Sequence, residues 1–259
     1  MIRKAPFKAV FFGLEVFKCI LQEERAMALD GRLKAIADAV PKSHKVADIG
    51  TDHGYVPLAL LEDHRSEYAI AADISAGSLN KAARLIRLQH MEHCMEVRLG
   101  DGLSVLAPGE ADTILITGMG GLLISDILDK GKDVARTASA LILQPMTAQE
   151  ELRRWLIANE YGIADEELVQ EGRRIYEILI VVPGRADTRP AADIYYDIGW
   201  KLVEKNHPLL GELIRNRIQT MEEIILQLKN GKTEAARIRQ RELEGKIQQY
   251  KEVVHCHVK

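Results

Sequence analysis

Short apolar runs alternate with stretches of mixed polar and apolar residues from about residue 33 to residue 182. The apolar runs predict strands at 45–49, 68–72, 95–99, 112–116 and 139–143. Between these runs, apolar residues recur at helical spacing and predict helices at 56–64, 76–90, 121–130 and 148–159. This regular alternation of strands and helices favours a doubly wound parallel sheet.

Two further apolar runs, 163–170 and 174–182, lie on either side of Glu171-Gly172. A link this short joins antiparallel strands, because a parallel connection needs a crossover of a dozen or more residues. Residues 27–190 are therefore predicted to form an α/β domain whose seven-stranded sheet ends in an antiparallel hairpin.

Residues 191–259 follow a Pro-Gly boundary at 183–184 and form a second predicted domain. Pro208 opens one predicted helix, Asn230-Gly231 turns the chain, and a second helix follows. Apolar residues along these helices are spaced by four and three positions: Ile214, Ile218, Met221, Ile225 and Leu228, then Leu243, Ile247, Tyr250 and Val254. These short heptad seams predict an antiparallel, coiled-coil-like helical hairpin.

The first 26 residues differ from the rest, because all four phenylalanines of the chain lie within its first 17 positions. Lys8, Glu15 and Lys18 interrupt the apolar stretch and argue against a secretory signal. We expect residues 1–26 to be an extension that does not share the core of the domain, with Met27 as an alternative initiator. A helix that packs on the domain is the competing interpretation.

The composition is that of an ordinary soluble chain, with 259 residues, 47% hydrophobic residues and a formal net charge of −3. No apolar run approaches the ~20 residues that span a bilayer, so no membrane association is expected. The three cysteines, Cys19, Cys94 and Cys256, fit neither a disulfide framework nor a metal site. We therefore expect a cytoplasmic protein without a bound metal. The sequence does not fix its oligomeric state, and a monomer is the default expectation.

The slightly negative net charge gives no support to nucleic-acid binding by the chain as a whole, so an RNA partner must use a local patch. The second helix of the predicted hairpin contains more basic than acidic residues: Lys232, Arg237, Arg239, Arg241 and Lys246, against Glu234, Glu242 and Glu244. Such a run forms either a solvated helix face or a weak RNA-contact patch.

The most informative motif runs from Val46 to Pro57, where a strand ends in Asp48 and the chain turns through Gly50 and Gly54 into a helix. Glycines let the backbone approach a ligand, and the first helical turn offers free N–H donors. The motif is not the Gly-x-Gly-x-x-Gly of dinucleotide binders. An acid at the strand end repels a pyrophosphate but pairs with an ammonium group, which S-adenosylmethionine has. A plain structural turn is the alternative.

Two more acids close the next two predicted strands. Asp73 follows Asp48 by 25 residues, the position from which a carboxylate accepts hydrogen bonds from ribose hydroxyls. Asp101, within a Gly-Asp-Gly turn, is placed to accept a hydrogen bond from the exocyclic amine of an adenine. For each acid taken alone, a helix cap or turn residue is the simpler interpretation. Three of them in successive strand–helix units favour a site for S-adenosylmethionine.

The loop after the fourth strand, Thr117 to Gly121, should face the reacting atom, because ligands bind outside the carboxyl ends of such strands. Enzymes that methylate exocyclic amines often have an Asn/Asp-Pro-Pro-aromatic loop here, and this chain has Thr-Gly-Met-Gly-Gly. A glycine-rich loop suits a ring nitrogen, whose free lone pair needs no base. A glycine-rich helix start without a role in substrate choice is the alternative.

Six segments together resemble the bacterial tRNA (adenine-22-N1)-methyltransferases: 47–57, 98–103, 118–121, 143–145, 152–156 and 176–177. The resemblance extends from about Leu29 to the C-terminus. It implies a Rossmann-like, class I S-adenosylmethionine-dependent methyltransferase fold and a C-terminal domain for tRNA. It also implies methyl transfer to N1 of an adenine, at position 22 in the D-arm. The chain departs from the family pattern in the extension before Met27, and in Asp73 where Glu is more common.

The resemblance also implies the roles of individual residues. The cofactor-binding residues are expected to be Asp48, Gly50, His53, Asp73, Ile74, Asp101, Gly102, Leu103, Gly118 and Met119. Asp52, His53 and Tyr55 are expected to be catalytic, where cofactor and target base meet. His53 as a donor that only orders the loop, and Tyr55 as a lid over the strand, are the alternatives.

The expected reaction is an in-line displacement in which adenine N1 takes the methyl group from the sulfonium, helped by proximity and alignment. Other functions stay open from the sequence. They are a methyltransferase for another RNA or a small molecule, and a non-catalytic RNA-binding protein that keeps a cofactor site. A nicotinamide oxidoreductase is disfavoured because its glycine motif is absent.

Overall fold

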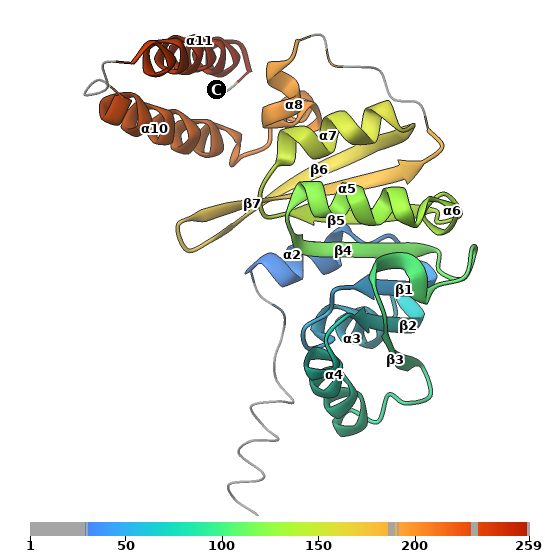
Figure 1. The fold of residues 1–259 in the computed structure, drawn as a ribbon. Helices are drawn as coiled ribbons and strands as arrows, with labels where there is room; N and C mark the ends of the chain where they lie inside the picture. Colours follow the sequence, from blue (N-terminus) through green and yellow to red (C-terminus); the bar gives the residue numbers. More distant parts are fainter. Residues whose placement is uncertain (1–28, 30, 186–189, 191, 229–232, 258–259) are drawn as a thin grey trace, which may run out of the picture.

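The computed structural model describes residues 29, 31–185, 190, 192–228 and 233–257, which form an α/β body with a helical hairpin at one end (Figure 1). The predicted extension, residues 1–26, lies outside the described residues. Its separation from the core therefore stays a prediction.

One mixed sheet forms the centre of the molecule. Its strands are β1 (Ser43–Ile49), β2 (Ser66–Asp73), β3 (Met95–Leu99), β4 (Thr113–Met119), β5 (Ala140–Pro145), β6 (Tyr161–Glu171) and β7 (Arg174–Pro183). Their order across the sheet is β3-β2-β1-β4-β5-β7-β6. The first five are parallel to one another, whereas β7 is antiparallel to both β5 and β6. The predicted fold class is confirmed, and the predicted strand ends differ from the observed ones by only a few residues.

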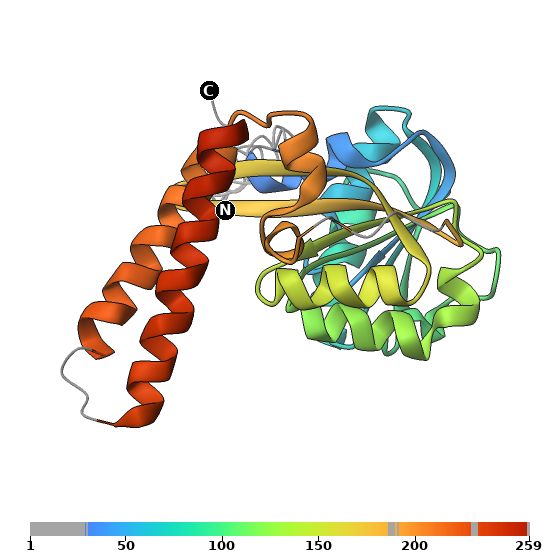
Figure 2. The same ribbon diagram turned by 90° about the horizontal axis from the view of Figure 1, so that it is seen from above.

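Helices cover both faces of the sheet (Figure 2). One face packs on α2 (Gly31–Ala39), α3 (Tyr55–Glu62) and α4 (Ala76–Leu88). The other packs on the 3-10 helix η1 (Gly102–Val105), α5 (Gly121–Lys130), α6 (Lys132–Ala135) and α7 (Gln149–Ala158). Because helices cover both faces, the central strands are apolar on both sides. In β1, for example, Val46 and Ala47 pack into opposite cores.

The carboxyl edge of the sheet collects the loops that the sequence singled out. The loops after β1 to β5 all leave this edge, because these five strands are parallel. Since β7 is antiparallel to β5, and β6 is antiparallel to β7, β6 also ends here. The β6–β7 turn therefore projects from the same edge as the predicted cofactor loops.

Two short helices that the sequence did not predict connect the sheet to the hairpin. They are α8 (Ile194–Ile198) and α9 (Trp200–Glu204). Ile194 and Ile198 pack on Leu168 of β6, while Tyr196 and Trp200 join the core beneath α7. Residues just after position 191 thus complete the core of the sheet, as well as leading into the C-terminal helices.

The predicted helical hairpin consists of α10 (Leu210–Leu228) and α11 (Glu234–His257), which run side by side (Figures 1 and 2). Ile225, Leu243 and Ile247 from the two predicted seams pack together toward its free end. Nearer the sheet, Tyr250 is fully buried among residues of α8, α9 and α10.

A buried network of charges joins the hairpin to the sheet. Arg153 of α7 is fully buried. Its Nε donates to the carboxylate of Glu166 on β6 and its Nη2 donates to that of Glu177 on β7, both at 2.6 Å. Glu177 also accepts from Arg217 of α10, which donates at 3.0 Å to Asp197 of α8. Asp197 accepts in turn from two side chains of α11, Lys246 at 2.7 Å and the hydroxyl of Tyr250.

We expect Arg153→Ala to destabilise the protein by about 3–5 kcal/mol, because it leaves two buried carboxylates without their shared cation. Chemical unfolding followed by circular dichroism measures the loss. The adjacent Arg154 is the matched control, since its side chain is 40% exposed and pairs with Glu150 at 2.9 Å. Arg154→Ala should cost about 1 kcal/mol or less. Equal losses in the two variants would contradict a structural role specific to the buried network.

Candidate functional site

The loop after β1 is held close to its neighbours at the carboxyl edge. The backbone N–H groups of Gly50 and Thr51 both donate to the carbonyl of Ala72, at 2.8 and 3.0 Å. Gly50 has a φ of +84°, and a Cβ built on it would lie 2.0 Å from Cε of Met119 on β4. The position requires glycine for both reasons. The loop after β1 is therefore in contact with the end of β4, which brings together Gly50 and Met119, two of the residues predicted to bind the cofactor.

Asp48 is a nearly buried carboxylate at the end of β1, with 7% of its surface exposed. Burial raises its pKa from 3.8 to about 6, an effect that a hydrogen bond from Thr51 opposes and the nearby Asp73 reinforces. No described residue forms an ion pair with Asp48. A buried acid that lacks a basic partner suits a ligand that brings a positive charge.

As predicted, Asp73 is the last residue of β2, and Asp101 lies in the loop that follows β3. Oδ1 of Asp73 accepts from the N–H of Ser75 at 2.6 Å, which also fixes the start of α4. Asp101 precedes η1, and its carbonyl rather than its carboxylate accepts from Ser104. A cavity of about 430 Å³ lies beside Asp101, Gly102 and Leu103.

Exposed apolar side chains surround these acids. Ile74, which follows the largely buried β2, is 73% exposed, and Leu99, at the end of the edge strand β3, is 63% exposed. Leu123 of α5, 51% exposed, lines the cavity beside Asp101. Polar acceptors at strand ends with apolar surfaces between them suit a ligand that has both a ring and hydroxyl groups.

The three predicted catalytic residues form a connected group. Asp52 is exposed and pairs with Lys81 of α4 at 2.8 Å and with Nδ1 of His53 at 2.9 Å. The hydrogen bond from Lys81 is the main reason why the pKa of Asp52 lies below its usual value. The rings of His53 and Tyr55 stack at 5.0 Å with an interplanar angle of 4°. Each aromatic ring therefore has one face covered by the other.

The glycine-rich loop after β4 is fixed by the loop after β5. Gly121 donates to the carbonyl of Thr147 at 2.8 Å, and Met146 donates to the carbonyl of Met119 at 2.7 Å. A Cβ built on Gly121 would lie 2.3 Å from the carbonyl oxygen of Ala148, so glycine is required there. Backbone hydrogen bonds thus hold the loops after β4 and β5 together.

Gln144 of β5 and Arg32 of α2 support this loop, and the sequence did not predict them as site residues. Oε1 of the buried Gln144 accepts from the N–H of Gly118 at 3.2 Å and from Nη1 of Arg32 at 2.8 Å. The Arg32 guanidinium lies over the ring of Tyr176, 5.3 Å from its centroid. Gln144 and Tyr176 lie in segments that carried the family resemblance. No sequence pattern marks Arg32, whose contacts become evident only from the position of α2 in the structure.

Two kinds of feature are absent from the residues that the structure describes. No group of three or more His, Cys, Asp or Glu side chains among them has an arrangement that would hold a metal ion. None of the helices described is long and apolar enough to cross a membrane.

We expect Asp48→Asn to stabilise the free protein at neutral pH and to leave it unchanged in acid. A carboxyl whose folded pKa exceeds its unfolded value stabilises the fold below pH 4 and loses that contribution as the pH rises through about 6. Unfolding in urea should therefore show a gain of roughly 1–3 kcal/mol for the variant at pH 7.5, and almost none at pH 4.

Asp52→Asn is the control for this prediction, because the pKa of Asp52 is shifted in the opposite direction. This substitution should give no stabilisation at pH 7.5. The same pH dependence in both variants would show that burial of Asp48 is not the cause.

The sequence is similar to those of known proteins. The family model for tRNA (adenine(22)-N(1))-methyltransferase matches residues 46–252. The enzyme of that name from Bacillus subtilis is 38% identical over 161 residues, 62% of this chain and 68% of that protein. A putative tRNA methyltransferase of Mycoplasma pneumoniae is 33% identical over 176 residues, 66% of this chain and 80% of that protein.

Solved structures give the same result. The crystal structure of the Bacillus subtilis m1A22 tRNA methyltransferase has a TM-score of 0.79 at 31% identity, covering 88% of this chain and 99% of that one. A putative tRNA (m1A22) methyltransferase of Streptococcus pneumoniae, solved with S-adenosylmethionine, has a TM-score of 0.75 at 28% identity. Its match covers 86% of this chain and 98% of that one. Since the family model spans most of the chain, the protein belongs to the tRNA (adenine(22)-N(1))-methyltransferase family.

Proposed function

We propose that this protein transfers the methyl group of S-adenosylmethionine to N1 of the adenine at position 22 of tRNA. The observation that carries the proposal is the set of acids at the ends of β1, β2 and β3, with Asp48 buried and without a basic partner. A ligand with an ammonium group, two ribose hydroxyls and an adenine amine matches these three acceptors in order.

The residues at this edge suit the cofactor on their own chemistry. Asp48 would pair with the ammonium group, next to the turn that the positive φ of Gly50 allows. Asp73 would accept from the ribose hydroxyls, and Asp101 from the adenine amine, with backbone N–H groups of Gly102 and Leu103 nearby. The exposed side chain of Ile74 would pack on the adenine ring. His53, Gly118 and Met119 would complete the binding site.

The methyl acceptor is proposed to be a ring nitrogen. When bound, S-adenosylmethionine supplies a methyl group on a positively charged sulfur. Adenine N1 has a free lone pair, so the protein needs no general base and acts mainly by alignment. The Gly118–Gly121 loop, held by backbone hydrogen bonds to the β5 loop, lets a planar base approach the backbone closely.

Asp52, His53 and Tyr55 are proposed to act as one unit. Methylation of N1 makes the base cationic, and the Asp52 carboxylate would stabilise the developing charge. Lys81 favours the ionised form of Asp52. Because His53 already stacks on one face of the Tyr55 ring, the target adenine would stack on the other face of Tyr55.

Gln144 and Arg32 are proposed to position the glycine loop rather than to react. Oε1 of Gln144 accepts from both Arg32 and the N–H of Gly118. Its Nε2 donates to the carbonyl of Pro145 at 3.0 Å. This arrangement fixes which way the amide faces, and so fixes the backbone of Gly118.

The C-terminal hairpin, residues 191–259 with its two connecting helices, is proposed to hold the tRNA. We further propose that the enzyme acts as a cytoplasmic monomer, which sedimentation of the purified protein would test. Nucleotides as deep in a folded RNA as this adenine must be unstacked before they reach a pocket, at a cost of a few kcal/mol.

The cofactor proposal predicts that titration calorimetry detects binding of S-adenosylmethionine and not of NAD. Asp101→Ala should weaken binding by roughly 1–3 kcal/mol, because a donor of the adenine loses its acceptor. Asp126→Ala is a suitable control, since Asp126 lines the same cavity but pairs with Lys130 at 2.6 Å. Equal affinity for NAD would contradict the proposal.

The reaction itself is tested by incubating the protein with methyl-labelled S-adenosylmethionine and bulk bacterial tRNA, then digesting the RNA and identifying the labelled nucleoside. We expect 1-methyladenosine at position 22. Label in another nucleoside would indicate a different RNA target. Cofactor binding without any transfer would favour a non-catalytic RNA-binding protein, or an enzyme for a small molecule.

A further inference from the structure

A groove of about 620 Å³ separates the β6–β7 turn from helices α10 and α11. One end of the groove is formed by Pro145, Met146 and Thr147, the segment that holds the glycine loop of the candidate site. The groove therefore starts at the place proposed for the target base and extends along the helical hairpin. Figure 1 shows the turn projecting beyond the other strands on the side where α10 lies.

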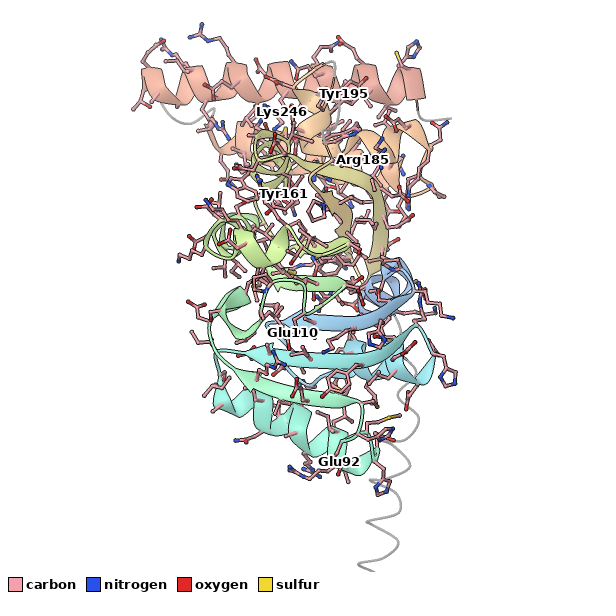
Figure 3. The ribbon with its side chains drawn as sticks, turned by 90° about the vertical axis from the view of Figure 1, so that its right-hand side faces the viewer. Glu92, Glu110, Tyr161, Arg185, Tyr195 and Lys246 are labelled. Atoms are coloured by element: carbon pink, nitrogen blue, oxygen red, sulfur yellow. The ribbon has the colours of Figure 1, made fainter. Side chains whose placement is uncertain are left out.

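Two arginines of the β6–β7 turn line this groove without acidic partners. Arg173 and Arg174 are both exposed, and neither forms an ion pair or a side-chain hydrogen bond with any residue that the structure describes. Deeper in the groove, Arg217 and Lys246 are already paired with Asp197. Figure 3 shows Lys246 close to the level of Tyr195, where the hairpin meets the sheet domain.

The arginines of α11, unlike those of the turn, have acidic partners. Arg237 and Arg241 both pair with Glu234, at 3.8 and 3.3 Å, and Arg239 pairs with Glu242 at 3.1 Å. The excess positive charge that the sequence indicated on this helix is therefore largely offset within the helix. Of the five cations that line the groove, Arg173 and Arg174 are therefore the two without an ion pair among the described residues.

Part of the groove wall is apolar. Met146 is 36% exposed and Ile224 of α10 is 37% exposed, with Met221 and Tyr176 beside them. Apolar side chains bind the faces of unstacked bases, while neighbouring cations bind phosphates. Bases within a duplex are stacked on one another and would not reach this wall.

We propose that this groove binds the single-stranded RNA segment next to the target adenine, with Arg173 and Arg174 on its phosphates and the Met146–Ile224 wall on its unstacked bases. The inference rests on the proposed function for its substrate, and it names the surface that holds that substrate. Folded duplex RNA is expected to contact the protein elsewhere.

The charged part of the groove is tested by Arg173→Gln/Arg174→Gln, measured by fluorescence anisotropy on a 12-nucleotide single-stranded RNA and on a duplex of equal length. The variant should bind the single strand about tenfold more weakly. Its plot of log K against log salt should flatten by about 1.4, the value for two lost phosphate contacts. Binding to the duplex should change less than about twofold.

Arg237→Gln/Arg241→Gln is the matched control, because it removes the same charge from exposed positions where both arginines pair with Glu234. It should alter single-strand affinity less than about threefold. A loss as large as that of the turn variant would overturn the assignment of the groove, since general charge would then explain both.

The apolar wall is tested by Ile224→Ser, which should weaken single-strand binding about fivefold without changing the salt dependence. Leu226→Ser is the control on the same helix, since Leu226 is 66% exposed but does not line the groove. Equal effects of the two substitutions would overturn this part of the proposal.

Cofactor titration and tRNA methylation by the unaltered protein separate the two proposals. If the unaltered protein fails to methylate tRNA, the proposed function is wrong, whereas the single-strand binding data still decide about the groove. If it methylates tRNA, and the turn variant does so with unchanged KM for tRNA, the groove proposal is wrong and the function stands.

Discussion

The placement of the helical hairpin on the sheet depends on the charge of Arg153. This guanidinium is fully buried and is shared by carboxylates of β6 and β7, while its Nη1 donates to the carbonyls of Tyr196 and Asp197 in α8. Burial raises the pKa of Glu166, so its ionised form depends on the nearby arginine. A buried charge is costly unless every hydrogen-bonding group around it is matched. The geometry of several elements is therefore specified by one side chain.

The same network extends into the hairpin through Asp197. Burial alone would raise the pKa of this carboxyl, but Arg217, Lys246 and Tyr250 hold it below its ordinary value. These three partners come from α10 and α11, so both helices are bound to the same point of the sheet domain. The groove beneath the hairpin is consequently a fixed feature of the fold.

Much of this architecture could be predicted from sequence, because the decisive information was local. Apolar runs and glycine turns placed all seven strands, and Asp48, Asp73 and Asp101 stand at strand ends as expected. The contact between Gly50 and Met119 follows from the adjacency of β1 and β4, which a doubly wound topology implies. The heptad seams of α10 and α11 predicted their pairing in the same way.

Features that depend on contacts between distant segments could not be predicted. Arg32 and Gln144 are 112 positions apart, and neither residue type indicates the other. The helices α8 and α9 are only five residues each, too short for periodicity to reveal. The sequence located excess positive charge on α11, but it could not show that Glu234 and Glu242 pair with those arginines. Arg153 and Glu177 carried the family resemblance without any indication that they form one buried network.

The raised pKa of Asp48 links the proposed cofactor site to the proton concentration of the solution. Near pH 6 about half of the free protein would carry a proton on this carboxyl, whereas pairing with an ammonium group requires the ionised form. Ligand binding would therefore release a fraction of a proton to the buffer at that pH, and almost none at pH 8. The heat of binding measured near pH 6 would then contain the ionisation enthalpy of the buffer, so that two buffers of equal pH give different apparent enthalpies for the same association.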